Sequence, residues 1–244
     1  MKFIFGNWKM NHNSKSCDEY IKIFKKQKVS NVKFGIAVPY VYLEKVSKKL
    51  RKNCLIGAQN CSAYEKGSFT GDISASMLKD LGIDFCLVGH SERRTKFFET
   101  DEDVNLKIQQ LVQNNIIPML CIGETLQQYE AKETKKVLKK QLEKALKNIE
   151  ASSLKKLIIA YEPVWAIGTG KTADSKTINN IIEYIKKELV KLLGETGSKI
   201  KVLYGGSVTD ENANELIHNQ IVDGALVGGA SLDAVKFTNI GRNI

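Results

Sequence analysis

The sequence contains no hydrophobic run long enough to cross a membrane. No apolar stretch reaches the roughly 18–20 residues that a helix needs to span a bilayer. Residues 1–9 also lack the long apolar core and the small-residue cleavage site of a signal peptide. We therefore expect a cytosolic protein with no membrane partner.

Metal-binding and disulfide patterns are missing as well. The five cysteines form no CxxC pair and no cluster with metal-ligand spacing. Three of them, Cys54, Cys86 and Cys121, lie in apolar runs, where a thiol behaves as a small buried side chain. This usage is typical of a reducing compartment. It predicts neither a disulfide framework nor a bound metal.

Arginine is rare, although the net charge is +10. Only four of the 37 basic residues are arginine, whereas phosphate recognition in nucleic acids commonly recruits the two parallel hydrogen bonds of a guanidinium group. The densest lysine runs alternate with leucines at helical spacing, which is typical of a solvated amphipathic face. We therefore expect no nucleic-acid partner, although the positive field would attract an anionic substrate.

The chain does contain a regular alternation of two kinds of segment. Eight short runs are apolar throughout, which is typical of strands buried on both faces. These runs are Phe3–Trp8, Phe34–Val38, Leu55–Ala58, Phe85–Val88, Ile116–Ile122, Leu157–Tyr161, Lys201–Tyr204 and Gly224–Val227. The amphipathic stretches between and after them are Ser16–Lys26, Tyr40–Leu50, Met77–Leu81, Asp101–Asn114, Lys135–Ile149, Ser175–Leu193 and Asn212–His218.

This alternation predicts an α/β fold. Eight strand–helix units favour a closed parallel (β/α)8 barrel with an outer ring of helices. An open, doubly wound sheet is the competing interpretation, because counting strands cannot establish that the first pairs with the last. No linker-like or low-complexity stretch divides the chain. We therefore expect a single domain over residues 1–244.

Polar residues and glycines follow several of the predicted strands. In a parallel barrel the functional groups gather at the carboxyl ends of the strands, so these positions are informative. They hold Asn7 and Lys9, Gly89–Arg94, Glu162, Gly205–Ser207 and Gly228–Ser231. The two glycine pairs leave backbone N–H groups open to an anion, and their position after the last two strands favours a phosphate site over two simple turns.

Glu162 is the best candidate for a general base. It directly follows the buried run Leu157–Tyr161, and Pro163 prevents the strand ladder from continuing. Trp165 and two glycines follow in a loop, so a carboxylate at a strand end is joined to a segment that could close over it.

Two nucleotide-binding motifs nearly match this loop. Residues 170–172 resemble the end of a P-loop, but that motif requires glycine where Trp165 stands. Residues 168–173 match a dinucleotide fingerprint, but six residues separate them from the preceding strand, whereas the fingerprint needs a tight strand-to-helix turn. We reject both motifs and interpret the glycines as a hinge and a backbone donor in a lid.

His90 is the histidine most suited to catalysis. It follows the buried run Phe85–Val88 and opens a helical turn, whose dipole is expected to disfavour protonation and leave a neutral imidazole. Together with Glu162, Lys9 and an anion site, it suggests that Glu162 removes a proton from a carbon beside a carbonyl group. His90 and Lys9 would then stabilise the enediolate oxygen. The result is an aldose–ketose isomerisation that needs no cofactor and no metal.

Eight motifs, spread along the whole chain in the same order, resemble those of the triosephosphate isomerase family. They are Gly6–Asn11, Ala58–Cys61, Phe69–Ser74, Val88–Arg94, Cys121–Glu124, Ala160–Gly170, Tyr204–Val208 and Val227–Leu232. The resemblance implies a TIM barrel that interconverts D-glyceraldehyde 3-phosphate and dihydroxyacetone phosphate, an isomerase of glycolysis and gluconeogenesis without a cofactor.

The resemblance also implies roles for individual residues. Glu162 matches the base, His90 the electrophile and Lys9 the positive charge near the enediolate. Asn7 matches a substrate contact, and Glu92 matches the residue that contacts Lys9. The implied phosphate-binding residues are Gly168, Ser207, Gly228 and Gly229, and the implied lid residues are Pro163, Trp165, Gly170 and Thr172.

The family is generally homodimeric, which implies a second copy of this chain as a partner. The loop over residues 61–71 would reach the partner's site, with Phe69 and Thr70 at the contact. Two alternatives stay open from the residues alone. One is another phosphate-binding barrel, such as a sugar-phosphate epimerase or an aldolase, and the other is a lysine-rich nucleic-acid- or surface-binding protein.

Overall fold

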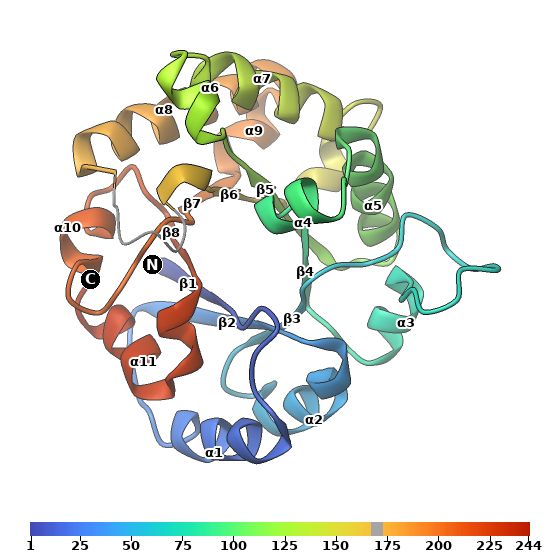
Figure 1. Ribbon diagram of the computed structural model, residues 1–244, viewed down its shortest axis with the longest axis vertical. Helices are drawn as coiled ribbons and strands as arrows, with labels where there is room; N and C mark the ends of the chain where they lie inside the picture. Colours follow the sequence, from blue (N-terminus) through green and yellow to red (C-terminus); the bar gives the residue numbers. More distant parts are fainter. Residues whose placement is uncertain (167–172) are drawn as a thin grey trace.

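The computed structural model describes residues 1–166 and 173–244. Its eight parallel strands form a closed barrel in sequence order (Figure 1). They are β1 (Lys2–Asn7), β2 (Val32–Val38), β3 (Leu55–Ala58), β4 (Phe85–Val88), β5 (Ile117–Ile122), β6 (Ile158–Tyr161), β7 (Lys201–Tyr204) and β8 (Gly224–Val227). Because β1 pairs with both β2 and β8, the predicted (β/α)8 TIM barrel is confirmed and the open sheet is wrong.

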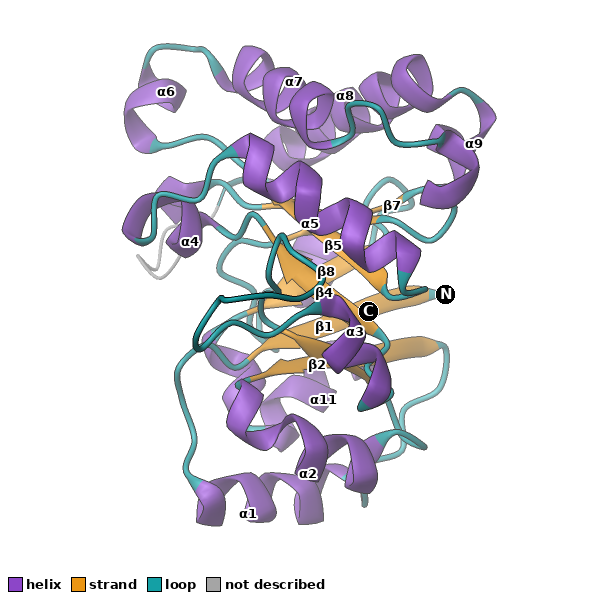
Figure 2. Cartoon of the chain, turned by 90° about the vertical axis from the view of Figure 1, so that its right-hand side faces the viewer, coloured by secondary structure: helices purple, strands orange, loops and turns teal. Residues whose placement is uncertain are grey.

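The helices lie outside the sheet (Figure 2). The longer ones are α1 (Ser14–Phe24), α2 (Tyr40–Leu50), α5 (Asp101–Gln113), α7 (Thr134–Ala145), α8 (Ser175–Leu193) and α11 (Ala234–Arg242). The shorter ones are α3 (Ala75–Asp80), α4 (Ser91–Lys96), α6 (Leu126–Glu130), α9 (Glu195–Lys199) and α10 (Ala213–Ile217), with 3-10 turns η1 (Ala151–Leu154), η2 (Val164–Ala166) and η3 (Gly229–Leu232). None of the helices that the structure describes is long and apolar enough to cross a membrane.

Helices α1 and α11 are two of the places where the structure differs from the sequence-based expectation. Helix α1 begins two residues earlier than expected. The Asn13 side chain accepts a hydrogen bond from the Ser16 N–H, and Ser16 Oγ accepts one from the Asn13 N–H, which forms a capping box. Helix α11 was not predicted. Asp233 caps it by accepting from two backbone N–H groups, and its residues Phe237 and Ile240 are buried.

The core has an inner and an outer part. The outer part joins the strands to the helices, whereas the inner part contains strand residues only, among them Phe5, Phe85, Met119 and Leu203. The Phe5 and Phe85 rings meet edge to face, with centroids 4.8 Å apart. These rings fill the barrel interior, so the binding space lies at its rim.

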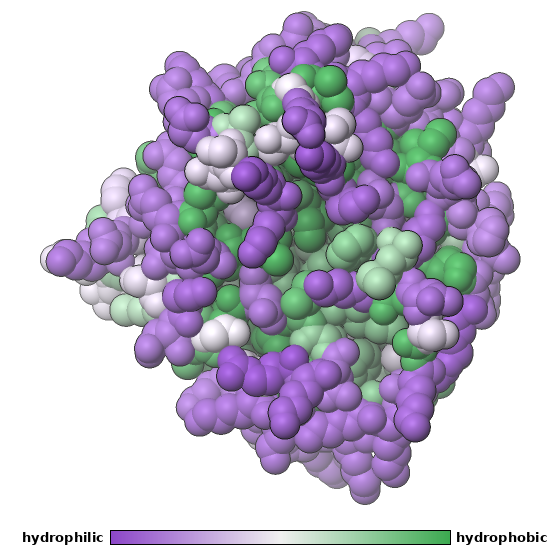
Figure 3. Space-filling view, turned by 180° about the vertical axis from the view of Figure 1, so that it is seen from behind, coloured by the Kyte–Doolittle hydropathy of each residue, from purple (hydrophilic) through white to green (hydrophobic). Residues whose placement is uncertain are grey.

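The surface carries the lysine-rich, solvated helix faces that the sequence predicts. Seen from behind, hydrophilic residues surround the molecule and apolar residues gather nearer the centre of that face (Figure 3). Several lysines pair with glutamates one helical turn away, as Lys187 does with Glu183 and Lys199 with Glu195. Exposed pairs of this kind contribute little to stability, and they disperse the positive charge over the outer helices.

Candidate active site

A cavity of about 320 Å³ opens at the carboxyl ends of the strands. Most of the site residues expected from the sequence meet there: Asn7, Lys9, His90, Glu162, Ser207, Gly228 and Gly229 line it. The same wall includes Gly205, Gly206 and Leu226. Gly168, Gly170 and Thr172 lie outside the described residues.

Backbone hydrogen bonds on both sides hold Glu162 at the end of β6. Its N–H donates to the Ile122 carbonyl oxygen at 2.7 Å, and the Gly205 N–H donates to the Tyr161 carbonyl oxygen at 2.7 Å. Pro163 follows and ends the strand. The side chain is almost completely buried, and one carboxylate oxygen, Oε2, accepts a hydrogen bond from the Ser91 N–H at 3.2 Å.

His90 sits at the N-terminus of α4 with its ring facing Glu162. Its Nδ1 accepts a hydrogen bond from the Glu92 N–H at 3.2 Å, so the neutral ring carries its proton on Nε2. Nε2 lies 3.1 Å from Glu162 Oε1 and donates to it. The preceding Gly89 has φ +69, and a Cβ there would lie 2.7 Å from the Arg94 guanidinium, so the turn into His90 requires glycine.

The direction of the His90 pKa shift differs from the one expected from the sequence, which was a lowered pKa. Burial alone would lower its pKa, but the charge and hydrogen bond of Glu162 outweigh burial and raise the pKa above the ordinary value. The expected lowering is therefore wrong for this arrangement. Helix α4 has only six residues, and its dipole is weaker at Nε2 than a carboxylate in direct contact.

Lys9 enters the cavity from the segment after β1. Its Nζ lies 2.8 Å from Glu92 Oε1, and both side chains are partly exposed. Burial opposes ionisation of Glu92, but the hydrogen bond and charge of Lys9 lower the pKa of its carboxyl group. Lys9 has φ 53, and its backbone is held by a hydrogen bond from its N–H to Asn7 Oδ1 and by one from Gln59 Nε2 to its carbonyl oxygen.

The glycines after β7 and β8 line the cavity and form a glycine wall. A Cβ built on Gly229 would meet no atom within 4 Å, and one on Gly228 would meet only the end of the Lys9 side chain, 3.7 Å away. Open backbone beside an ammonium group suits an anionic ligand. Ser207 lies at this wall, and its hydroxyl donates to the Ala166 carbonyl oxygen at 2.7 Å.

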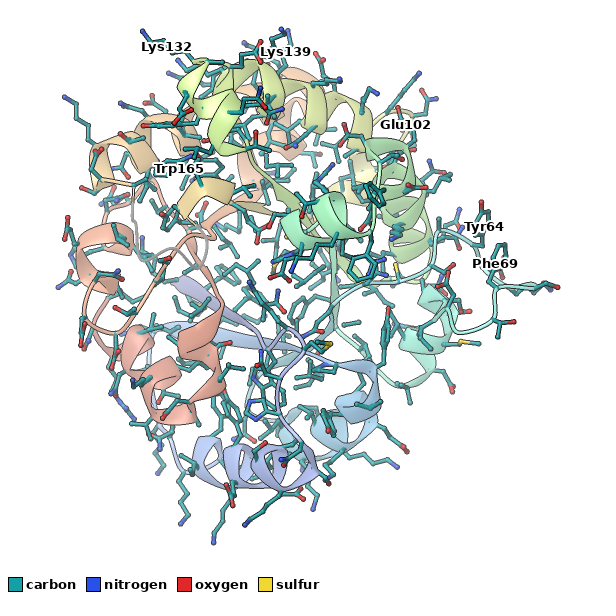
Figure 4. The ribbon with its side chains drawn as sticks, in the orientation of Figure 1. Tyr64, Phe69, Glu102, Lys132, Lys139 and Trp165 are labelled. Atoms are coloured by element: carbon teal, nitrogen blue, oxygen red, sulfur yellow. The ribbon has the colours of Figure 1, made fainter. Side chains whose placement is uncertain are left out.

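Trp165 packs beside the site on a buried carboxylate. Its indole N–H donates to Glu124 Oε1 at 2.9 Å, and the Tyr161 hydroxyl donates to the same oxygen at 3.2 Å. Its ring stacks on Tyr129 of α6, with centroids 4.4 Å apart. Figure 4 shows Trp165 beside this part of the barrel rim. Burial raises the pKa of Glu124 despite these hydrogen bonds.

The comparison with known proteins agrees with this geometry. The family model for triosephosphate isomerase matches residues 2–244. The chain belongs to this family. It is 46% identical over 243 residues to the triosephosphate isomerase of Mycoplasmoides gallisepticum, covering 98% of this chain and 96% of that protein. It is similar to that of Mycoplasma capricolum (46%, covering 98% and 97%) and to that of Alkaliphilus metalliredigens (45%, covering 97% of each).

The residues implied at the family's dimer contact do not reach this chain's own cavity. Phe69 and Thr70 lie on the long loop between β3 and α3, which projects from the barrel (Figures 1 and 4). Phe69 stacks on Tyr64 with centroids 4.2 Å apart, and both rings stay substantially exposed.

Three residues around the triosephosphate isomerase site received no role from the sequence. Gln59 bonds the Lys9 backbone, Glu124 holds Trp165, and Arg94 Nε donates to the Gly89 carbonyl oxygen at 2.7 Å. All three stand inside motifs that resemble those of the family, and this position could have pointed to a role for them. Among the residues described, no group of three or more His, Cys, Asp or Glu side chains is placed to hold a metal ion.

Proposed function

We propose that this protein interconverts D-glyceraldehyde 3-phosphate and dihydroxyacetone phosphate by proton transfer through an enediolate. One observation carries the proposal: a buried carboxylate, an imidazole and an ammonium group line the same cavity as an open glycine wall. The glycine wall takes the phosphate, and the three side chains act on the two carbons that exchange the carbonyl group.

Glu162 acts as the base in this mechanism. Its carboxylate removes a proton from the carbon beside the carbonyl group and returns it to the neighbouring carbon. The Nε2–H of His90 and the Lys9 ammonium stabilise the oxygen that becomes negative, while Asn7 contacts the substrate. The hydrogen bonds at the backbone of Glu162 restrict its main chain, so the carboxylate reaches the substrate by side-chain rotation.

The pKa of His90 depends on where the Glu162 carboxylate lies. Its pKa is raised while Glu162 faces Nε2. When the carboxylate turns towards the substrate carbon, this stabilisation of the charged ring weakens. Protonation at Nδ1 would also break the hydrogen bond from the Glu92 N–H. The neutral ring therefore becomes more favoured as the base engages, and it donates from Nε2.

The lid and the remaining phosphate contacts rest on the family resemblance. We infer that Pro163, Trp165, Gly170 and Thr172 belong to a loop that closes over the substrate and excludes water. Gly168 adds a backbone donor to the phosphate in the closed state, beside Ser207, Gly228 and Gly229.

An aldolase mechanism is the main enzymatic alternative, and the described cavity disfavours it. A Schiff-base mechanism needs a lysine amine that can attack the carbonyl carbon. Lys9, the one lysine among the described residues that line the cavity, instead donates to Glu92 Oε1 at 2.8 Å, an arrangement that suits electrostatic stabilisation of an oxyanion.

A coupled isomerase assay on purified protein tests the function. Glu162→Gln should lower kcat by about 10²–10⁴-fold, because it removes a positioned general base. Glu211→Gln is the matched control, since Glu211 is an exposed glutamate outside the cavity. Equal activity in the two variants would rule out the proposed base.

We also propose that two copies of this chain form a homodimer. Each copy has a projecting loop with exposed Tyr64 and Phe69, and a groove of about 190 Å³ beside the active site that includes Lys9 and His90. Around that groove, Met10 and Phe97 are strongly exposed. Burying the apolar loop tip in the groove would remove both apolar surfaces from water and place the partner subunit's Thr70 near the site.

Sedimentation analysis tests this assembly. The unmodified chain should sediment as a dimer, and Phe69→Asp should shift it towards the monomer because it places a charge in an apolar contact. Met77→Asp is the control, because Met77 is also an exposed apolar residue but lies on α3. A monomer at all concentrations for the unmodified chain would contradict the proposal.

We further expect residues 1–244 to form a single domain that works in the cytosol. The five free thiols are buried, and a reducing compartment would keep them reduced.

A further inference from the structure

Gln141 of α7 makes an unusual contact with the end of β5. Its Oε1 accepts a hydrogen bond from the Gly123 N–H at 2.9 Å, and its Nε2 donates to the Gly123 carbonyl oxygen at 3.1 Å. One side chain thus satisfies both backbone groups of one residue. Gly123 is the first residue after β5, where the ladder with β6 ends.

The position of Gln141 on its helix is otherwise apolar. Leu138, Leu142 and Ala145 form the buried face of α7, and Gln141 lies between Leu138 and Ala145 on that face. An amide at such a position loses hydration, which must be offset by hydrogen bonds. The two bonds to Gly123 supply them, so the contact explains why this position is polar.

A single peptide unit connects this contact to the proposed base. The peptide between Ile122 and Gly123 presents its N–H to Gln141 Oε1 at 2.9 Å. The same peptide presents its carbonyl oxygen to the Glu162 N–H at 2.7 Å. Because a peptide unit is planar and rigid, the orientation of this one is set jointly at both ends. The hydrogen bonds also polarise each other along the chain.

The backbones of Gly123 and Glu162 are in direct contact as well. A Cβ built on Gly123 would lie 1.7 Å from the Glu162 carbonyl oxygen, so no side chain fits between the two residues. A shift of Gly123 towards or away from the barrel would therefore displace Glu162 with it. On the other side, the Gly205 N–H holds the peptide before Glu162.

We propose that Gln141 is a positioning residue for the base, acting through the Ile122–Gly123 peptide. It is not among the residues that line the substrate cavity. Its role is to hold the peptide that fixes the Glu162 backbone. The position of that backbone determines where the carboxylate can reach. This inference rests on the proposed function, because it assigns Glu162 as the base.

Kinetics of Gln141→Leu test the inference. The change removes both hydrogen bonds at nearly constant size, and a misplaced base should lower kcat by about 10-fold, given that a displacement of about 1 Å can cost roughly 100-fold. KM should change little, because the glycine wall is untouched. Gln113→Leu is the matched control: Gln113 is exposed at the end of α5 and lies outside the site. Wild-type kcat in Gln141→Leu would overturn the proposal.

Gln141→Glu provides a second test with nearly identical shape. Its carboxyl group, when protonated, can accept from the Gly123 N–H and donate to the Gly123 oxygen, whereas the ionised group can only accept. The ratio of its kcat to that of the unmodified protein should therefore rise as the pH falls through the titration of this carboxyl group. A ratio that stays constant with pH would contradict the two-bond mechanism.

An NMR titration of His90 separates the failure of this inference from the failure of the proposed function. If Gln141→Leu displaces Glu162, the pKa of His90 should fall relative to the Gln113→Leu control, whether or not the protein is an isomerase. An unchanged His90 pKa would overturn the positioning role. An inactive unmodified protein with a shifted His90 pKa would instead overturn the isomerase function alone.

Discussion

His90 and Glu162 meet across the barrel rim, with Nε2 of the imidazole 3.1 Å from Oε1 of the carboxylate. They come from the ends of β4 and β6 and are 72 positions apart in the sequence. Both side chains are nearly completely buried, so little water screens the contact. The Glu162 carboxylate therefore acts strongly on the charge of His90 and raises its pKa.

Replacing the carboxylate should be visible at the histidine. In Glu162→Gln, burial still lowers the pKa of His90, but the carboxylate charge that opposes burial in the unmodified protein is gone. We expect the His90 pKa to fall, measured by NMR titration of the imidazole signals. The chain has only three histidines, which simplifies the assignment. A His90 pKa equal to that in Glu211→Gln would show that the His90 imidazole and the Glu162 carboxylate are not electrostatically coupled.

Glu124 should make stability depend on pH. Burial raises its pKa in the folded protein, so between the ordinary glutamate value and the raised value the folded state binds more protons than the unfolded state. The free energy of unfolding should therefore fall as the pH rises through that window. Urea unfolding at several pH values should show a smaller decline for Glu124→Gln, and an identical slope in the two proteins would contradict this.

Removing the Lys9 charge should affect catalysis far more than stability. The Lys9–Glu92 pair is partly exposed, so its contribution to folding is small. Lys9→Met should lower kcat/KM by about 10²–10³-fold, as loss of a preorganised oxyanion-stabilising group does. Lys199→Met, at an exposed helical pair, is the control. Comparable loss in both variants would point to surface charge rather than a role in the site.

Gly57→Ala should destabilise the barrel interior. A Cβ there would lie 2.3 Å from the Phe85 ring, which is fully buried and cannot move away freely. Overpacking of this kind costs about 1–3 kcal/mol. Gly229→Ala is the matched control, since its Cβ would meet no protein atom within 4 Å. Equal free energies of unfolding from urea titrations would contradict this account of the inner core.

Much of the fold could be predicted because the strands are apolar throughout. The bounds of β3, β4, β7 and β8 agree with the runs in the sequence. Helix α4 is too short for a helical period to show, and α11 contains Thr238, Asn239 and Gly241, which are weak helix formers. Packing of Phe237 and Ile240 stabilises α11 instead, and packing of this kind is a tertiary contribution.

The sequence by itself determined which residues stand at the strand ends. Glu162, His90 and Lys9 were identifiable because each follows an apolar run at a position where a barrel collects functional groups. The glycine pairs were identifiable for the same reason. Patterns of this kind involve only residues that are neighbours in the chain, so they can be recognised before the fold is known.

Only the tertiary structure decided closure of the barrel, the charge balance of His90, and the link from Gln141 to Glu162. Closure depends on pairing between β1 and β8, at opposite ends of the chain. The direction of the His90 pKa depends on a carboxylate within 3.1 Å, and the pairing of β4 and β6 with β5 brings the two residues to the same rim. The Gln141 contact joins a helix side chain to a strand-end backbone, and no sequence period records such a hydrogen bond.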